Sequence, residues 1–163
     1  MREIAERRSI RKYKDTPVPK EQVELLIKAA TLAPSGHNTQ PWRFFVIEDE
    51  EIRTKAAKAD HDQEWLKTVP VLIACVADST LRDDRDMMRV VRDTSIAAEH
   101  ILLQAQHMGL GSCWTGWYEQ EDMRQILGVD DTCFVVGVLA VGYADEDPEA
   151  RPRKDLGEVC SVL

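Results

Sequence analysis

The sequence lacks any apolar run long enough to cross a membrane. Its longest apolar stretches are residues 71–77 and 133–141, whereas a membrane-spanning helix needs about 20 residues. The first residues are charged and contain no apolar core, so no secretory signal is expected. We therefore predict a cytoplasmic protein without a membrane partner.

Metal-binding spacing is also absent. The chain has four cysteines, which are widely scattered: Cys75, Cys113, Cys133 and Cys160. They form no CxxC pair, and His100 and His107 lack the i, i+4 spacing of a zinc-binding helix. Three of the cysteines lie in or beside apolar segments, where cysteine commonly serves as a small buried hydrophobic residue. The sequence therefore predicts reduced thiols and no metal site.

The chain has little positive charge. It carries 21 Lys and Arg against 29 Asp and Glu, giving a formal net charge of −8, which argues against a nucleic-acid partner. In such an acidic protein, clustered arginines indicate an anionic ligand. Arg7, Ser9 and Arg11 alternate in a segment expected to be extended, so they should share one face, with Arg8 on the other. Guanidinium groups match phosphate oxygens, although charged clusters are often merely solvated.

The length of 163 residues fits one domain, residues 1–163, of α+β class. Apolar periodicity predicts helices over residues 2–8, 50–59, 87–108 and 119–127, and one that ends before Pro34. Strands are predicted at 42–47, 70–77 and 132–143, with a short strand or turn at 112–117. The second strand is apolar on both faces, as in a covered central strand. The expected architecture is a mixed sheet covered by helices.

The segment from Ala33 to Phe45 reads APSGHNTQPWRFF. Pro34 stops the preceding helix. A row of hydrogen-bonding side chains then stands immediately before a proline and a tryptophan. A self-capping loop and a ligand-binding loop both fit this composition.

Four motifs give the chain a resemblance to a known family. They are PSGHNTQPWRF, the N-terminal RRSIRKY, the mid-chain GLGSCWTGW and the Arg-Pro-Arg at 151–153. Together they resemble the signature of the nitroreductase family of FMN-dependent oxidoreductases. The motifs occur in the family's order and span nearly the whole chain. The absence of a GxGxxG fingerprint and of a nucleophile–base pair is compatible with FMN chemistry.

The resemblance implies roles for the residues in these motifs. One implied group binds the FMN phosphate and ring edge: Arg7, Arg8, Ser9, Arg11, Arg151 and Arg153. A second group is contributed by the other subunit: Pro34, Ser35, Gly36 and Asn38. A third group lines the ring: Trp114, Thr115 and Gly116, with the Gly116 amide near the redox-active nitrogen. Asp62 stands where the family often has an asparagine, and an ionised aspartate cannot donate.

The resemblance also implies an activity and an assembly. Electrons would pass from NADH or NADPH through FMN to a nitroaromatic, quinone or similar electrophilic acceptor by a ping-pong mechanism. The protein would be a homodimer, with the 87–108 helix at the interface and a C-terminal arm exchanged with the partner subunit. Other functions remain open: dehalogenation or ene reduction on the same flavin, a non-catalytic flavin-binding redox protein, or a flavin-free module for apolar ligands. No specific role is assigned to His37 or Cys113.

Overall fold

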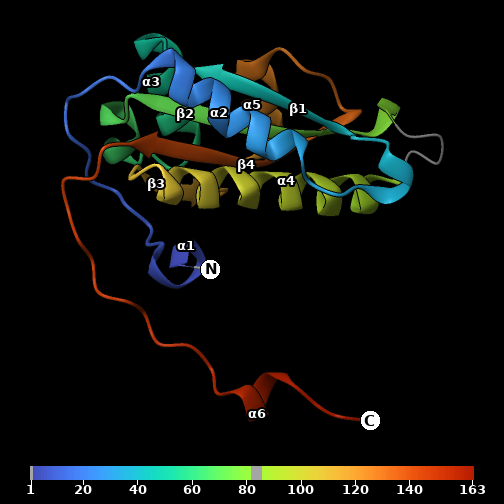
Figure 1. Ribbon diagram of the computed structural model, residues 1–163. Coiled ribbons are helices and arrows are strands. Elements are labelled where there is room, and N and C mark those ends of the chain that lie inside the picture. Colours follow the sequence, from blue (N-terminus) through green and yellow to red (C-terminus); the bar gives the residue numbers. More distant parts are fainter. Residues whose placement is uncertain (1, 82–85) are drawn as a thin grey trace.

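The computed structural model describes residues 2–81 and 86–163, and its centre is a four-stranded sheet (Figure 1). The strands are β1 (Trp42–Ile47), β2 (Val71–Asp78), β3 (Gly111–Thr115) and β4 (Cys133–Gly142). Their order is β1-β2-β4-β3, and all three pairings are antiparallel. The predicted α+β class is confirmed. A mixed sheet, as predicted, requires parallel pairing. Among the described residues, parallel pairing is limited to an isolated bridge between Ser9 and Ser112.

Strand β2 is buried on both faces, as its sequence predicts. Val71, Ile73 and Cys75 face one apolar cluster, whereas Leu72 and Ala74 face the other. This division follows from the strand period of two. Helices therefore have to cover both sides of the sheet.

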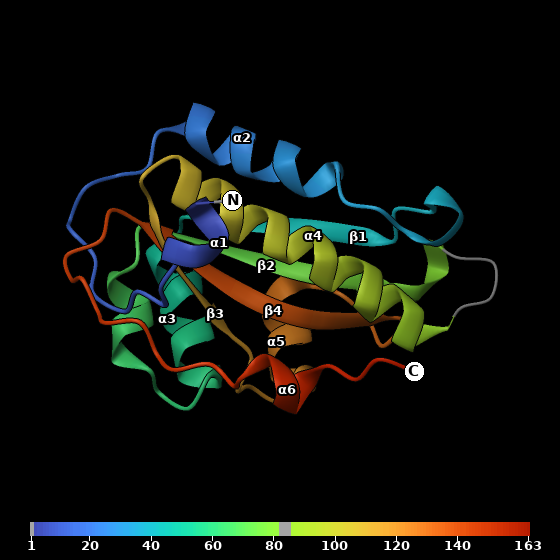
Figure 2. The ribbon, with the colours of Figure 1, turned by 60° about the horizontal axis from the view of Figure 1, so that its bottom comes forward.

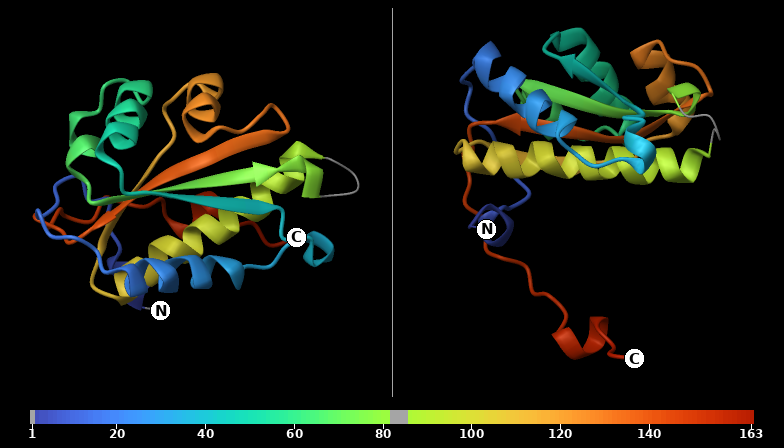
Figure 3. Two further views of the ribbon diagram at one scale, coloured as in Figure 1. Left: turned by 90° about the horizontal axis from the view of Figure 1, so that it is seen from above. Right: turned by 45° about the vertical axis from the view of Figure 1, so that its right-hand side comes forward.

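One face is covered by α2 (Lys20–Thr31) and α4 (Met87–His107), which lie side by side in Figure 2. The other face carries α3 (Glu50–Ala59), the 3₁₀ turn η2 (Glu64–Thr68) and α5 (Gln120–Leu127), as the left view of Figure 3 shows. Leu26 of α2 and Ile101 of α4 are fully buried in one cluster, and Met123 of α5 is buried in the other. The remaining short helices are α1 (Arg2–Glu6), η1 (Gly36–Asn38), η3 (Ser79–Leu81) and α6 (Leu156–Val159).

Local sequence signals explain two helix boundaries near the site. Asp49 caps α3 by accepting a hydrogen bond from the Ile52 amide at 2.9 Å. Helix α2 ends at Thr31, just before Pro34, because proline disfavours helical geometry in the residue that precedes it. The 34–41 segment is thereby freed to leave the helix axis.

The C-terminal tail leaves the body of the protein after a short anchored stretch. Asp145 donates its amide to the Lys12 carbonyl at 2.9 Å, and Glu146 accepts from the amides of Arg11 and Lys12. Residues 151–163 are exposed throughout, and Figures 1 and 3 show them running away from the sheet. The tail therefore contributes no buried side chain to the core from residue 151 onward. Every helix within the described ranges is too short or too polar to cross a membrane.

Candidate functional site

The residues predicted to bind the FMN phosphate lie together around one small cavity. This cavity has a volume of about 110 Å³ and is lined by Arg7, Arg8, Ser9, Arg11, Pro148, Glu149, Arg151 and Arg153. The two ends of the sequence therefore meet there. Five arginines face a single lining carboxylate, which concentrates positive charge in a protein of net charge −8. Guanidinium forks and a hydroxyl form a donor set suited to a phosphate.

The expectation that Arg8 points away from this group is wrong. Arg7 donates its amide to the Glu3 carbonyl at 3.0 Å, so it continues the helical turn of α1. Arg8 donates to the carbonyls of Ala5 and Arg7, both at 2.9 Å. Strand alternation therefore does not govern residues 7 and 8, and both side chains reach the same cavity.

The 34–41 loop has an unusual backbone. His37, Asn38 and Gln40 have φ values of 54°, 56° and 50°, in a region that non-glycine residues seldom occupy and that costs free energy. Ser35 supports the loop by accepting a hydrogen bond from the Gln40 amide at 2.9 Å. Such strained conformations are concentrated at ligand sites, and the exposed side chains of His37 and Asn38 remain available.

Asp93, which the sequence reasoning did not identify, anchors this loop. It lies on α4, is 2% exposed, and accepts a hydrogen bond from the Gly36 amide at 2.9 Å. The neighbouring Thr94 is fully buried and donates to the Pro41 carbonyl at 3.4 Å. A polar pair inside a largely apolar helical stripe is the signal that could have pointed to this anchor.

The loop and the arginine cavity lie at opposite corners of the sheet. Ser9 forms a β-bridge with Ser112, at the start of the edge strand β3. Ser112 and Val71, at the start of β2, are both paired with the same residue of β4, so they lie at the same end of the sheet. The loop leads into Trp42 in the other edge strand, β1, level with Ala77 at the far end of β2. The two places are separated by about 20 Å along the strands and about 14 Å across them. One mononucleotide does not bridge this diagonal within one subunit.

The predicted ring-lining residues follow each other at the end of β3. Trp114 is half-buried and packs so closely on Gly137 that a Cβ at position 137 would collide with its indole. Thr115 is buried, whereas Gly116 is exposed. The segment thus offers an aromatic surface beside an accessible backbone amide.

Two further polar residues meet this segment. Asp60 is fully buried and accepts a hydrogen bond from the Trp117 amide at 2.9 Å, and Gln63 donates to Thr115 Oγ1 at 3.2 Å. The prediction singled out Asp62, which is exposed with φ of 53°. Its neighbours at 60 and 63 make the contacts with the 115–117 turn instead.

The cysteines behave as buried apolar residues apart from Cys160, which is exposed. Burial raises the pKa of the Cys113 thiol, and the charge of Arg11 opposes this shift only in part. Raised pKa values keep thiols neutral and unreactive. Among the described residues, no group of three or more His, Cys, Asp or Glu side chains is arranged to hold a metal ion.

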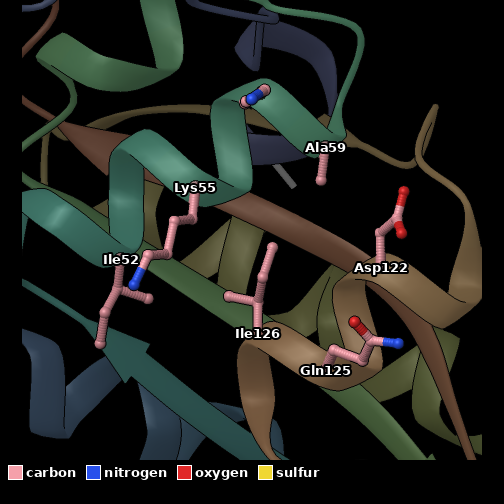
Figure 4. A pocket seen from close by; sticks show the side chains of 7 residues that line it. Ile52, Lys55, Ala59, Asp122, Gln125 and Ile126 are labelled. Carbon is pink, nitrogen blue, oxygen red and sulfur yellow. The ribbon is translucent and has the colours of Figure 1, made fainter.

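A hollow larger than the arginine cavity lies elsewhere, between α3 and α5 (Figure 4). It measures about 650 Å³ and is lined by Ile52, Lys55, Lys58, Ala59, Asp122, Gln125 and Ile126. None of the residues in the family motifs lines it. Lys55 is engaged with Glu51 at 2.7 Å. We therefore assign the candidate site to the arginine cavity and the β3 end rather than to this groove.

Known proteins resemble this chain in sequence and in fold. A model of the nitroreductase family matches residues 4–65 and 54–143. A provisionally named NADH dehydrogenase/NAD(P)H nitroreductase from Archaeoglobus fulgidus is 37% identical over 157 residues, covering 93% of this chain and 89% of its own. Two solved structures are also similar. The FMN-dependent nitroreductase from Clostridium difficile is 34% identical with a TM-score of 0.84, covering 98% of this chain and 96% of its own. The NADPH:FMN oxidoreductase from Vibrio harveyi, solved with NAD+, is 25% identical with a TM-score of 0.92, covering 99% and 75%.

The family model and the NAD(P)H-linked relatives, together with the helix-covered antiparallel sheet, place the protein among α+β oxidoreductases. The chain belongs to the nitroreductase family.

Proposed function

We propose that the protein is an FMN-dependent oxidoreductase that passes electrons from NADH or NADPH to a nitroaromatic, quinone or similar small electrophilic acceptor. The whole chain, residues 1–163, forms the single FMN-binding domain. The observation that carries this proposal is the arginine cavity, because it gathers arginines from residues 7–11 and 151–153 around one small space. Family membership and the flavin-linked relatives support the choice of cofactor.

The residues present fit FMN. Five arginines and Ser9 line a cavity of a size suited to a phosphate group rather than to a ring. Arg7 and Arg11 make the principal phosphate contacts, with Arg151 and Arg153 closing the cavity from the tail. Charge-assisted contacts of this kind fix position as well as affinity.

The ring side of the site is formed by Trp114, Thr115 and Gly116. Trp114 supplies an apolar surface, and Gly116 leaves its backbone open to close approach because it has no Cβ. The chemistry that FMN supplies when bound is hydride acceptance from NAD(P)H followed by electron transfer to the acceptor, in a ping-pong sequence. The chain's own residues bind and orient the cofactor and donate hydrogen bonds to it.

The site is completed by a second copy of the chain. Pro34, Ser35, Gly36 and Asn38 are too far from the arginine cavity to share one flavin with it in the same subunit. A two-fold dimer brings the loop of one copy to the cavity of the other. The tail is exposed along its whole length from residue 151, and Leu32 after α2 and Met88 on α4 are also exposed, so a partner subunit has apolar surface to cover. The tail exchanged between subunits is part of this proposal.

The deciding experiment is the absorption spectrum of the purified protein before and after addition of NADH and of NADPH. The proposal predicts a flavin spectrum that bleaches with at least one nicotinamide and returns when a quinone or nitroaromatic is added. Chromatography of the released cofactor should identify FMN.

Three outcomes would contradict the proposal. Release of FAD would contradict the single-phosphate site, and a protein that binds no flavin after reconstitution would be a module for other ligands. A bound flavin that no nicotinamide reduces would indicate a redox-sensing role. A screen that includes halogenated and ene substrates identifies the acceptor class.

A further inference from the structure

Asp60 is a fully buried carboxylate at the C-terminal end of α3. One oxygen, Oδ1, accepts a hydrogen bond from the Trp117 amide at 2.9 Å. The other, Oδ2, accepts from Thr115 Oγ1 and from Gln63 Nε2. All three donors belong to or contact the turn that follows β3.

This arrangement needs a reason, because burying a carboxylate is costly unless it is fully compensated. Within residues 2–81 and 86–163, Asp60 takes part in no ion pair, so hydrogen bonds alone hold it. Asp60 is the acceptor in each of these hydrogen bonds. Trp65 Nε1 donates to Gln63 Oε1 at 2.8 Å, which turns the Gln63 amide nitrogen toward Asp60 and Thr115. Every partner of Asp60 is therefore set as a donor.

The hydrogen bonds to Asp60 hold the residues on both sides of Gly116. Thr115 and Trp117 are both tied to Asp60, whereas Gly116 between them is exposed, and its amide has no acceptor within the part of the chain that the structure describes. A second tie comes from the His61 ring, whose centroid lies 4.2 Å from that of Trp117. The turn is thus fixed on both sides of one free amide.

We propose that Asp60 is a positioning residue that holds the Thr115–Trp117 turn so that the Gly116 amide points at the reactive edge of the flavin. This inference rests on the proposed function. In this proposal a buried side chain outside the family motifs controls the position of a backbone hydrogen-bond donor. Hydrogen-bond donors stabilise a reaction most effectively when the protein fixes them in place before the reaction begins.

The variant Asp60→Asn tests the hydrogen-bond direction with almost no change of shape. In one orientation of the introduced asparagine side chain, its Nδ2 faces the Nε2 donor of Gln63. In the other orientation, Nδ2 faces the backbone amide of Trp117. If the Gln63 side-chain amide flips to relieve the first conflict, its own Nε2 then faces Trp65 Nε1. Each choice leaves two donors facing each other. The added change Trp65→Phe removes the last conflict, because Gln63 can then accept from the introduced amide.

The matched control is Asp78→Asn. Asp78 is 6% exposed and accepts from the amide of Thr80 at 2.9 Å and from its hydroxyl. It lies at the end of β2, away from the 115–117 turn. It is also paired with Arg43 at 3.7 Å, so the variant reports what loss of a buried, ion-paired carboxylate away from that turn does to the fold.

Two measurements are needed, one of which requires no flavin. In the flavin-free protein, hydrogen exchange of the Trp117 amide should accelerate at least roughly tenfold in Asp60→Asn, since either the bond to this amide is lost or the unmatched Gln63 donor destabilises the turn that protects it. In the FMN-loaded protein, the reduction rate at saturating NAD(P)H should fall roughly tenfold to a hundredfold. FMN affinity should change less than about threefold, because the arginine cavity is untouched. The double variant Asp60→Asn/Trp65→Phe should recover most of both losses.

The proposal is overturned if Asp60→Asn matches Asp78→Asn in both exchange and reduction rate, or if the double variant recovers neither. If Asp60→Asn does not fold, Gln63→Leu removes one donor while Asp60 remains, and unchanged exchange and reduction in that variant would overturn the idea. Failure of the proposed function is a separate result, since the unaltered protein would then bind no FMN or leave it oxidised.

Discussion

Asp93 on α4 and Gly36 in the 34–41 loop are joined by a hydrogen bond of 2.9 Å between the carboxylate Oδ2 and the backbone amide. The loop contains three non-glycine residues with positive φ, so its conformation depends on external support. The bond links the core of the protein to the loop that we propose for the partner's flavin.

Asp93→Ala should loosen this loop, whereas Asp93→Asn should largely preserve it because the asparagine Oδ1 can still accept from Gly36. Loss of a hydrogen bond to a charged group costs about 1.5–3 kcal/mol. The alanine variant should therefore bind FMN roughly ten- to a hundredfold more weakly. Hydrogen exchange over residues 35–41, together with FMN titration, checks this. Equal behaviour of the two variants would show that the acceptor is not what holds the loop.

Arg11→Ala and Arg7→Ala should each weaken FMN binding, because each removes a guanidinium from the cavity. The expected loss is about 1.5–3 kcal/mol, or roughly ten- to a hundredfold in affinity. Thermal unfolding should barely change in Arg11→Ala, since Arg11 is exposed. A small loss of stability is expected in Arg7→Ala, since Arg7 is partly buried and lies 3.9 Å from Glu99 on α4. Lys58→Ala, in the groove between α3 and α5, is the control. Unchanged affinity in both arginine variants would rule out this phosphate site.

Gly137→Ala should displace the Trp114 indole, because the added Cβ would occupy the space of the ring. Overpacking of this kind costs about 1–3 kcal/mol of unfolding free energy. Tryptophan fluorescence should shift, and the spectrum of bound FMN should change with it. Gly157→Ala is the matched control, because no atom lies within 4 Å of its added Cβ. A normal flavin spectrum in Gly137→Ala would show that Trp114 does not line the ring.

Truncation after Asp147 should weaken both dimerisation and FMN binding. It removes the exposed tail and also Arg151 and Arg153 from the cavity. The double variant Arg151→Ala/Arg153→Ala retains the tail and should lose FMN affinity while remaining dimeric. Light scattering combined with FMN titration separates the two effects. A truncated protein that stays dimeric would contradict the exchanged arm.

Catalysis should tolerate the loss of the His37 side chain. We expect His37→Ala to keep substantial NAD(P)H oxidation with a quinone, because His37 is exposed at the surface of the loop and the ring contacts depend on the backbone. Steady-state assays measure this. Near-complete loss of flavin reduction with FMN still bound would instead make His37 an acid–base participant.

The sequence was sufficient to predict most of the sheet and the main helices, because apolar periodicity and proline positions are local signals. β2 is covered on both faces as its residues indicate, and Asp49 caps α3. The residues that support the site were not predictable in this way. Asp60 contacts Trp117 across 57 positions and Asp93 contacts Gly36 across 57 positions, and each looks like an ordinary helix residue in the sequence. The place of Arg8 was missed because strand alternation was applied to residues 7 and 8, although the predicted 2–8 helix already covered them.

The placement of the 34–41 loop and the arginine cavity at opposite corners of the sheet has a genetic consequence for a dimer of the proposed kind. Each site takes its arginines from one subunit and its loop from the other. A subunit defective only in Arg11 and a subunit defective only in Asp93 would therefore assemble into a mixed dimer with one doubly defective site and one intact site. Co-expression of two inactive alleles should restore up to half of the activity per mixed dimer, which is intragenic complementation.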